Sequence, residues 1–159
     1  MSCNFSETNT NYLRDIHMAG SRTLTIVKPD AFGAGKAGKI VAHLEAAGFK
    51  VVAARVLKMT EAQAGAFYEV HKERPFYGSL TKFMTSGPCM PIVLEKSDAV
   101  SSLREAIGAT DPAEAAEGTV RKLYAESKER NAIHASDSDE NAARESLFFF
   151  SEAELIQAV

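Results

Sequence analysis

Four short β-rich segments, separated by stretches with helical signals, constrain the fold of this chain more than any other feature. Each is a run of apolar, often β-branched residues bounded by glycine, proline or polar residues, a pattern typical of strands. Pro91 indicates the beginning of a strand or an edge position, because proline cannot donate to a sheet ladder. The four segments are RTLTIVK at 22–28, FKVVAARVLKM at 49–59, PIVLE at 91–95 and SLFFF at 146–150.

Helical signals fill the intervals between these segments. They combine apolar spacing on one face with residues that start or stop helices. The first helix carries Ile40, Val41 and Leu44 and ends at Gly48, and the second begins with a Thr60–Gln63 capping box and is expected to bury Phe67 and Val70. A turn and a short helix are expected over 74–87, followed by a helix that Asp98 caps and Gly108 ends. Asp111-Pro112 is expected to start a further helical stretch, and a Ser151–Glu154 cap starts the last one.

This order of elements predicts an α/β (α+β) fold, a ferredoxin-like βαββαβ sandwich. Its four-stranded antiparallel sheet is expected to be covered by helices on one face. A doubly wound parallel sheet is the alternative, and it would need a more regular alternation of strands and helices. At 159 residues the chain has the length of one domain. We expect a flexible polar tail over 1–20 and a single domain over 21–159.

Charge and cysteine usage exclude some classes of function. The formal net charge is −3, which argues against binding nucleic acid through phosphate contacts. Cys3 and Cys89 form no C-x-x-C pair, and free thiols fit the reducing cytoplasm. The sequence has no apolar run long enough to span a membrane and no apolar core of a signal peptide at its start. We therefore expect a cytoplasmic protein with no membrane association.

The stretch GAGKAGKI at Gly33–Ile40 nearly matches the phosphate-binding pattern G-x-x-x-x-G-K-[ST]. Its last position is Ile40, where that loop needs a hydroxyl for Mg²⁺. A glycine-rich turn between a strand and a helix is the simpler interpretation. A P-loop phosphotransferase that depends on Lys39 remains an alternative.

His134 lies among small and polar residues, and several functions are open to it. The other histidines are scattered, so a metal site is not indicated. Ser136 and Asp137 are too near in sequence to form a hydrolase triad with it. A loop histidine without a function is the simplest alternative. A neutral imidazole can also attack phosphorus, given cations, a fixed tautomer and space for a phosphoryl group.

The surrounding sequence offers what a phosphorus nucleophile requires. Ala135 and Ser136 leave space, and Glu145 could hold the second ring nitrogen. Arg104 and Arg121 are candidate phosphate ligands, because guanidinium groups bind phosphate in a bidentate manner.

Five segments in order resemble the nucleoside diphosphate kinase family. The segment NAIHASDSDENAARE at 131–145 is similar to that family's active-site signature. The others are RTLTIVKPDAFGAGKAGKI, FYEVHKERPFYGSL, FMTSGPCMPIVLE and IGATDPAEAAEGTVRKLYA. Together they cover about 22–156.

The resemblance implies an enzyme that moves the γ-phosphate of a nucleoside triphosphate, mainly ATP, to a nucleoside diphosphate. The route would be ping-pong through a phosphohistidine, and the activity would maintain NTP and dNTP pools. By similarity, His134 is the nucleophile, Glu145 orients its ring and Tyr68 lies near it. The implied nucleotide ligands are Lys28 and Asn131 for the sugar and phosphates, Phe76 for base stacking, and Arg104, Thr110 and Arg121 for the phosphates.

The same resemblance sets expectations for cofactor, specificity and assembly. Mg²⁺ should arrive on the nucleotide, so no protein metal site is expected. Stacking on Phe76 should tolerate every base, because each base has a π-face. A homo-oligomer built from dimers is implied, either a tetramer or a hexamer. Ala135 in place of glycine, and Ser146 in place of an apolar residue, depart from the family's pattern. Ser146 is therefore expected near a less buried turn into the last strand.

Taken singly, the candidate residues also have structural interpretations. Phe76 could be core, Thr110 a cap, Arg104 a helix-surface partner, and Lys28 and Glu145 solvated charges. The competing functional class is a ferredoxin-like binding or regulatory module that senses nucleotides or contacts nucleic acid without catalysis. Such a module would have no use for a nucleophilic His134.

Overall fold

The computed structural model describes residues 20–156. Apart from Gly20, the predicted tail lies outside the described residues. The elements in chain order are β1 (Arg22–Val27), α2 (Pro29–Gly33), α3 (Ala37–Ala46), β2 (Lys50–Ala54), α4 (Glu61–Phe67), the 3₁₀ helix η1 (Glu69–His71), α5 (Tyr77–Met84), β3 (Met90–Glu95), α6 (Ala99–Ile107), α7 (Val120–Tyr124), β4 (Ile133–Ala135), α8 (Asp139–Phe149) and α9 (Glu152–Ile156).

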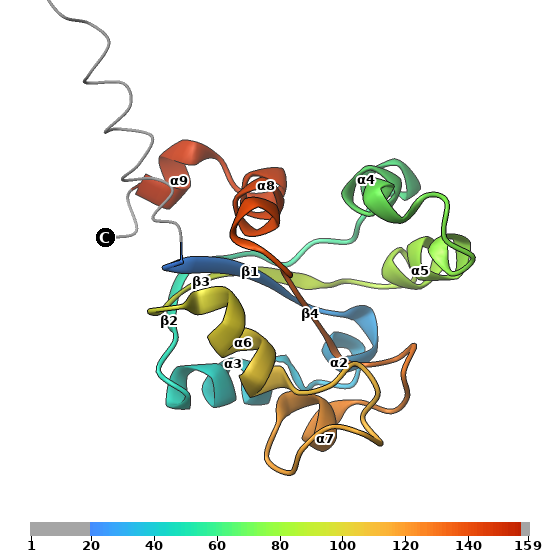
Figure 1. The fold of residues 1–159 in the computed structure, drawn as a ribbon. Helices are drawn as coiled ribbons and strands as arrows, with labels where there is room; N and C mark the ends of the chain where they lie inside the picture. Colours follow the sequence, from blue (N-terminus) through green and yellow to red (C-terminus); the bar gives the residue numbers. More distant parts are fainter. Residues whose placement is uncertain (1–19, 157–159) are drawn as a thin grey trace, which may run out of the picture.

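The four strands form one antiparallel sheet in the order β2-β3-β1-β4 (Figure 1). The predicted α+β sandwich with a four-stranded antiparallel sheet is confirmed, and the doubly wound alternative is wrong. Pro91 is the second residue of β3, as a strand start allows, but β3 is an interior strand and not an edge.

Helices cover both faces of this sheet, whereas the sequence predicted cover on one face. Figure 1 shows α8 and α9 on one side and α3 and α6 on the other. The two sides match two separate clusters of buried residues, since side chains along a strand alternate between faces. Leu24 and Ile26 of β1 belong to the cluster under α8, and Val27 belongs to the cluster over α3 and α6.

The predicted fourth strand over 146–150 is wrong, because this segment is the end of α8. The Ser138 side chain accepts from the Asn141 amide at 3.1 Å, and acidic residues fill the first turn. Both features start a helix, and the apolar run continues it. A short apolar run alone does not distinguish a strand from a buried helix. Ser146 is therefore buried within α8 and donates to the Ala142 carbonyl, rather than lying in a turn.

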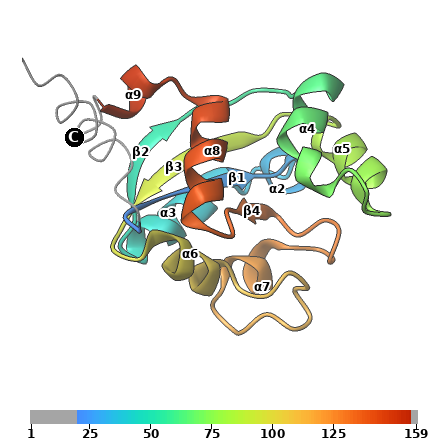
Figure 2. The ribbon, with the colours of Figure 1, turned by 45° about the horizontal axis from the view of Figure 1, so that its top comes forward.

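The true fourth strand is β4, which is only three residues long and contains His134. It pairs with β1 at the sheet edge, with His134 opposite Ile26. α8 follows it and crosses the sheet over β1 (Figure 2).

Some of the helix caps predicted from the sequence are present in the structure, and others are not. The Thr60–Gln63 capping box and the reciprocal Ser151–Glu154 bonds are both present. Phe67 is buried as predicted, but Val70 is 65% exposed because it lies in η1, beyond the end of α4.

The helix predicted between Asp98 and Gly108 is present as α6, whereas the helical stretch predicted from Asp111-Pro112 is absent. Asp98 occupies the N-cap position of α6, but it has a φ of 51° and its side chain makes no capping bond. Asp111 makes an Asx turn instead of starting a helix, with its Oδ1 accepting from the Ala113 amide at 2.9 Å. The next helix begins only at Val120. The glycine-rich stretch after Gly33 joins α2 to α3, with Gly35 at a φ of 72°, and so does not leave a strand directly.

Candidate active site

His134 and Glu145 meet where β4 faces α8. The His134 Nε2 lies 3.0 Å from Glu145 Oε2, and Ser136 Oγ donates to the same oxygen at 2.5 Å. An ionised carboxylate only accepts hydrogen bonds, so Nε2 carries the ring proton and the lone pair is on Nδ1. No hydrogen-bond partner of Nδ1 is found within residues 20–156. The contact therefore fixes the tautomer that leaves Nδ1 nucleophilic.

Aromatic side chains from the end of α4 hold the imidazole in place. The Phe67 ring packs edge-on against it at 5.4 Å, and the Tyr68 ring lies 6.2 Å away, between centroids. The Tyr68 hydroxyl is buried and has no partner in the described part of the chain. Burial, and then the charge of Glu145, raise the pKa of Tyr68 well above its ordinary value. Tyr68 therefore stays a neutral phenol beside the imidazole.

The Arg121 guanidinium lies directly behind β4. Its Nη2 donates to the Ile133 carbonyl at 2.9 Å, and its Nη1 donates to Gly108 at 3.1 Å. Burial, and then the nearby charge of Arg104, lower the pKa of Arg121 to about 10. It remains a cation at neutral pH. Its buried Nε has no partner within the described chain.

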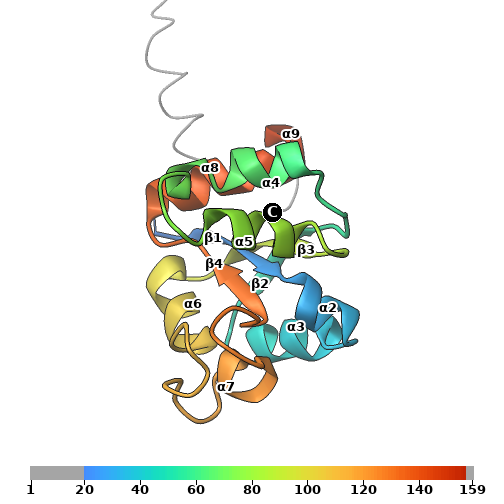
Figure 3. The same ribbon diagram turned by 90° about the vertical axis from the view of Figure 1, so that its right-hand side faces the viewer.

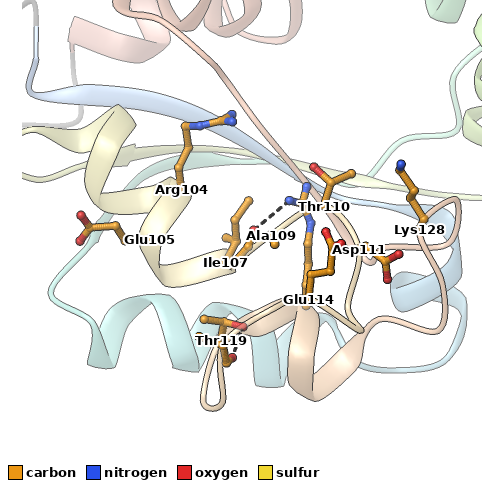
Figure 4. Close-up of a pocket in the computed structure, with 12 residues that line it drawn as sticks. Arg104, Glu105, Ile107, Ala109, Thr110, Asp111, Glu114, Thr119 and Lys128 are labelled. Carbon is orange, nitrogen blue, oxygen red and sulfur yellow. Dashed lines mark hydrogen bonds between the residues drawn. The ribbon is translucent and has the colours of Figure 1, made fainter.

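Arg104, Thr110 and Arg121 line one cavity of about 830 Å³ between α6 and α7. Figure 4 shows Arg104 and Lys128 at opposite ends of it, with Thr110 between them. Asp111 and Glu114 contribute carboxylates to the lining. Its cations suit a polyanion such as a nucleotide's phosphates.

Lys28 and Asn131 adjoin this cavity without lining it. Lys28 Nζ donates to Asn131 Oδ1 at 2.8 Å, and Asn131 Nδ2 donates to the Thr110 carbonyl at 3.4 Å. Burial, and then the charge of Arg121, lower the pKa of Lys28 to about 8, although Asp30 opposes the shift. The pKa of Lys28 therefore lies near neutral pH, and a bound anion would favour its charged form.

The charge of Arg104, which lines the cavity, also acts on the loop that follows His134. The pKa of Asp137 is lowered chiefly by a hydrogen bond from Asn141, and the charge of Arg104 contributes to the shift. β4 lies between α4 and α5 on one side and α6 and α7 on the other (Figure 3). The strand that carries His134 therefore lies between these two groups of helices at one edge of the sheet.

Phe76 is the predicted site residue that the structure does not bring against the others. It holds the N-cap position of α5, is 47% exposed, and its ring lies 5.5 Å from that of His71. An exposed ring face is what base stacking requires, and the interpretation of Phe76 as core is wrong.

Sequence reasoning missed three residues of this site. Ser136 binds the carboxylate that orients His134, Lys128 lines the cavity, and Asp30 accepts from the backbone two residues before His134. Ser136 is within the His134 motif, and Asp30 directly follows Lys28-Pro29, so both could have been considered. Lys128 had no signal of its own.

Two further features of residues 20–156 bear on other functions. This part of the chain contains no group of three or more histidine, cysteine or acidic side chains that could hold a metal ion. Nor does it contain a helix with the length and hydropathy to cross a membrane.

Comparison with known proteins is consistent with this geometry. Residues 21–155 match the family described as nucleoside diphosphate kinase. The chain is 58% identical over 137 residues to the nucleoside diphosphate kinase of Chlorobium chlorochromatii, covering 86% of this chain and 98% of that protein. It is 54% identical over 134 residues to that of Desulfatibacillum aliphaticivorans, covering 84% and 97%.

Solved structures give the same result. The nucleoside diphosphate kinase of Aquifex aeolicus superposes with a TM-score of 0.82 at 47% identity, over 84% of this chain and 96% of that one. A family protein from Babesia bovis has a TM-score of 0.79 at 35% identity, over 84% and 90%. Together with the five ordered segments, the sheet and the site around His134, these matches show that the chain belongs to the nucleoside diphosphate kinase family.

Proposed function

We propose that His134 is the residue through which this phosphotransferase passes the γ-phosphate of a nucleoside triphosphate to a nucleoside diphosphate. The observation that carries the proposal is the bond from His134 Nε2 to Glu145, which leaves the lone pair on Nδ1. Nδ1 attacks the γ-phosphorus as its bond to the bridging oxygen breaks, and the nucleoside diphosphate leaves with that electron pair. A terminal oxygen of the second diphosphate then attacks the phosphohistidine, the N–P bond breaks and the imidazole is restored.

The surrounding side chains supply positioning and charge, which phosphoryl transfer chiefly requires. Arg104, Arg121 and Thr110 line the cavity for the phosphates, supported by the two guanidinium charges. Lys28 and Asn131 are assigned to the sugar hydroxyl and the phosphates, supported by their bond beside the cavity.

Base recognition is assigned to the exposed ring of Phe76. Stacking alone accommodates every base, in ribo and deoxy forms alike. ATP as the main donor, and the supply of NTP and dNTP pools as the role in the cell, are part of the same proposal.

Mg²⁺ is proposed to enter on the nucleotide's phosphates. The donor set fits this, because Asp111 and Glu114 line the cavity and would offer oxygens to the ion's waters. When bound, the ion would neutralise phosphate charge.

We further propose a cytoplasmic homo-oligomer, a tetramer or hexamer built from dimers. β2 forms one edge of the sheet, and the nearby Val56 is 56% exposed, which supports contact between subunits on that side. Light scattering of the purified chain tests the assembly. The buried free thiol of Cys89 supports a reducing compartment.

Labelling with ATP that carries ³²P on its γ-phosphate tests the role of His134. The wild type should hold acid-labile, base-stable label, and His134→Ala should hold none. His43→Ala, which changes a histidine of α3, is the matched control and should label normally. Label that survives in His134→Ala would overturn the proposal, as would loss of label in Lys39→Ala alone, the result that a P-loop enzyme predicts. A protein that binds ATP but never carries label would be the binding module.

A further inference from the structure

The chain just before His134 takes a backbone conformation that alanine rarely adopts. Ala132 is fully buried and has a φ of 71°. The Ile133 amide donates to the Asn131 carbonyl at 2.9 Å, across a single residue. These two features describe a γ-turn of the rare, strained kind. Such a conformation persists only where the surrounding structure holds it in place.

Two contacts from the segment after β1, one through a backbone amide and one through a side-chain carboxylate, hold this turn. The Lys28 amide donates to the Ala132 carbonyl at 2.9 Å. The Ala132 amide donates to Asp30 Oδ2 at 3.0 Å. Both polar groups of the strained residue are therefore fixed by a segment about a hundred residues earlier in the chain.

Packing alone does not account for a carboxylate at position 30. Asp30 is 7% exposed, and its Oδ1 is buried without a hydrogen-bond partner in the described part of the chain. Burying a carboxylate with one oxygen unpaired costs stability. The carboxylate lies in the first turn of α2 and favours the charged form of Lys28. It also makes a strong, charge-assisted bond to the Ala132 amide.

The turn lies between two residues of the proposed site. On one side Asn131 accepts from Lys28 and reaches toward Thr110. On the other side β4 begins at Ile133, which places His134 opposite Ile26. If Ala132 relaxed to a negative φ, Asn131 and β4 could not both keep these positions.

We propose that Asp30 is a positioning residue of the phosphoryl-transfer site. By holding the Ala132 amide, its carboxylate keeps the γ-turn that sets the Asn131 side chain and the His134 imidazole relative to one another. This inference rests on the proposed roles of His134 and Asn131. Asp30 itself touches no reacting atom.

The test measures the single-turnover rate of His134 phosphorylation at saturating Mg²⁺-ATP, together with the urea midpoint of unfolding. Asp30→Ala should slow phosphorylation by about 100-fold, the scale expected when a reacting group is displaced by about 1 Å. Asp30→Asn keeps an oxygen acceptor and should remain within about tenfold of the wild type. Should Asp30→Ala fail to fold, Asp30→Ser, whose hydroxyl is too short to reach the amide, replaces it.

A second substitution separates positioning from general stability. Glycine takes positive φ without the penalty that alanine meets, so Asp30→Ala/Ala132→Gly should recover at least about fivefold in rate over Asp30→Ala. Asp98→Gly is the matched control, because Asp98 is the other non-glycine residue with positive φ in residues 20–156. In the Asp30→Ala background it should relieve comparable strain without restoring the rate.

The inference is overturned if Asp30→Ala phosphorylates His134 within about threefold of the wild-type rate, or if Asp30→Asn is as slow as Asp30→Ala. It is also overturned if, in the Asp30→Ala background, Ala132→Gly restores no more of the rate than Asp98→Gly does. These outcomes differ from failure of the proposed function. Wild-type protein that carries no label on His134 would overturn the function, whereas labelled wild type with an unaffected Asp30→Ala overturns only the role of Asp30.

Discussion

The imidazole of His134 and the carboxylate of Glu145 come from different elements, a three-residue edge strand and the middle of a helix, yet their side chains meet at 3.0 Å. Ser136, two residues after His134, donates to the same carboxylate oxygen. The carboxylate is therefore fixed from the β4 side as well. Any shift of α8 along the sheet would separate the pair, so the packing of α8 on β1 bears directly on the nucleophile.

Glu145→Ala should slow phosphorylation of His134 by roughly 10- to 100-fold, as loss of an orienting partner of a histidine typically does. Without the carboxylate, Nε2 no longer has a fixed acceptor and the required tautomer is only partly populated. Glu145→Gln should be less impaired, because its amide oxygen can still accept from Nε2. Rapid-quench measurement of phosphohistidine formation gives these rates.

Glu140→Gln is a suitable control for Glu145, since it removes an exposed carboxylate from the first turn of the same helix. It should leave the rate within about twofold of the wild type, as a surface change on α8 would. A Glu145→Ala protein that phosphorylates as fast as Glu140→Gln would show that the tautomer is set by something else.

Phe76→Ala should raise KM for every nucleoside diphosphate by a similar factor, about 5- to 150-fold, while kcat changes little. Stacking on an aromatic ring contributes about 1–3 kcal/mol and does not distinguish one base from another. Because the ring is 47% exposed, the free energy of unfolding should fall by less than about 1 kcal/mol. Steady-state kinetics with adenine, guanine, cytosine and uracil diphosphates checks the first expectation, and urea unfolding checks the second.

Phe76→Tyr keeps the stacking face and should behave like the wild type. An increase in KM confined to one base would contradict recognition by stacking alone. It would indicate a donor or acceptor that reads the edge of that base.

Local signals in the sequence predicted some helix starts correctly, although the caps expected at Asp98 and Asp111 are not formed. The Thr60–Gln63 and Ser151–Glu154 caps each involve residues three apart, and both are present. The segment over 146–150 failed because its aromatic run fits a strand or a helix equally well. The Ser138 cap that decides between them lies eight residues upstream.

The candidate site was predictable to the extent that its residues belong to recognisable segments. His134 and Glu145 share one motif, and the structure joins them. Asp30 also belongs to one of these segments, but its role could not be predicted from it, because its partner is a backbone amide 102 residues away. The positive φ of Ala132 could not be predicted from the sequence either, because alanine carries no sequence signal for this conformation.

The pH dependence of nucleotide binding should report the ionisation of Lys28, whose pKa is lowered to about 8. Below this pH the ammonium is charged and attracts phosphate, and above it the charge is lost. We therefore expect kcat/KM, which reports the free enzyme, to fall as pH rises through about 8. Bound phosphates favour the charged form, so kcat should hold to a higher pH.

Lys28→Arg is the control for this pH profile, because a guanidinium stays charged over the whole range. Its kcat/KM should be lower than that of the wild type, but the decline above pH 8 should move to higher pH. If the profile of Lys28→Arg falls at the same pH as the wild type, another group is responsible.

The same pKa predicts an effect on stability with a definite sign. Lys28 has a pKa of about 8 in the fold against an ordinary value of 10.5, so between these values the unfolded chain binds more protons than the folded one. The free energy of unfolding must therefore rise with pH across that window, by about 1.4 kcal/mol for each pH unit from this one group. Lys28→Met removes the buried charge and should be more stable than the wild type below pH 8. Urea unfolding from pH 7 to 10.5 should show this advantage narrowing as pH rises, and an advantage that stays constant would mean that the ammonium is not desolvated in the folded protein.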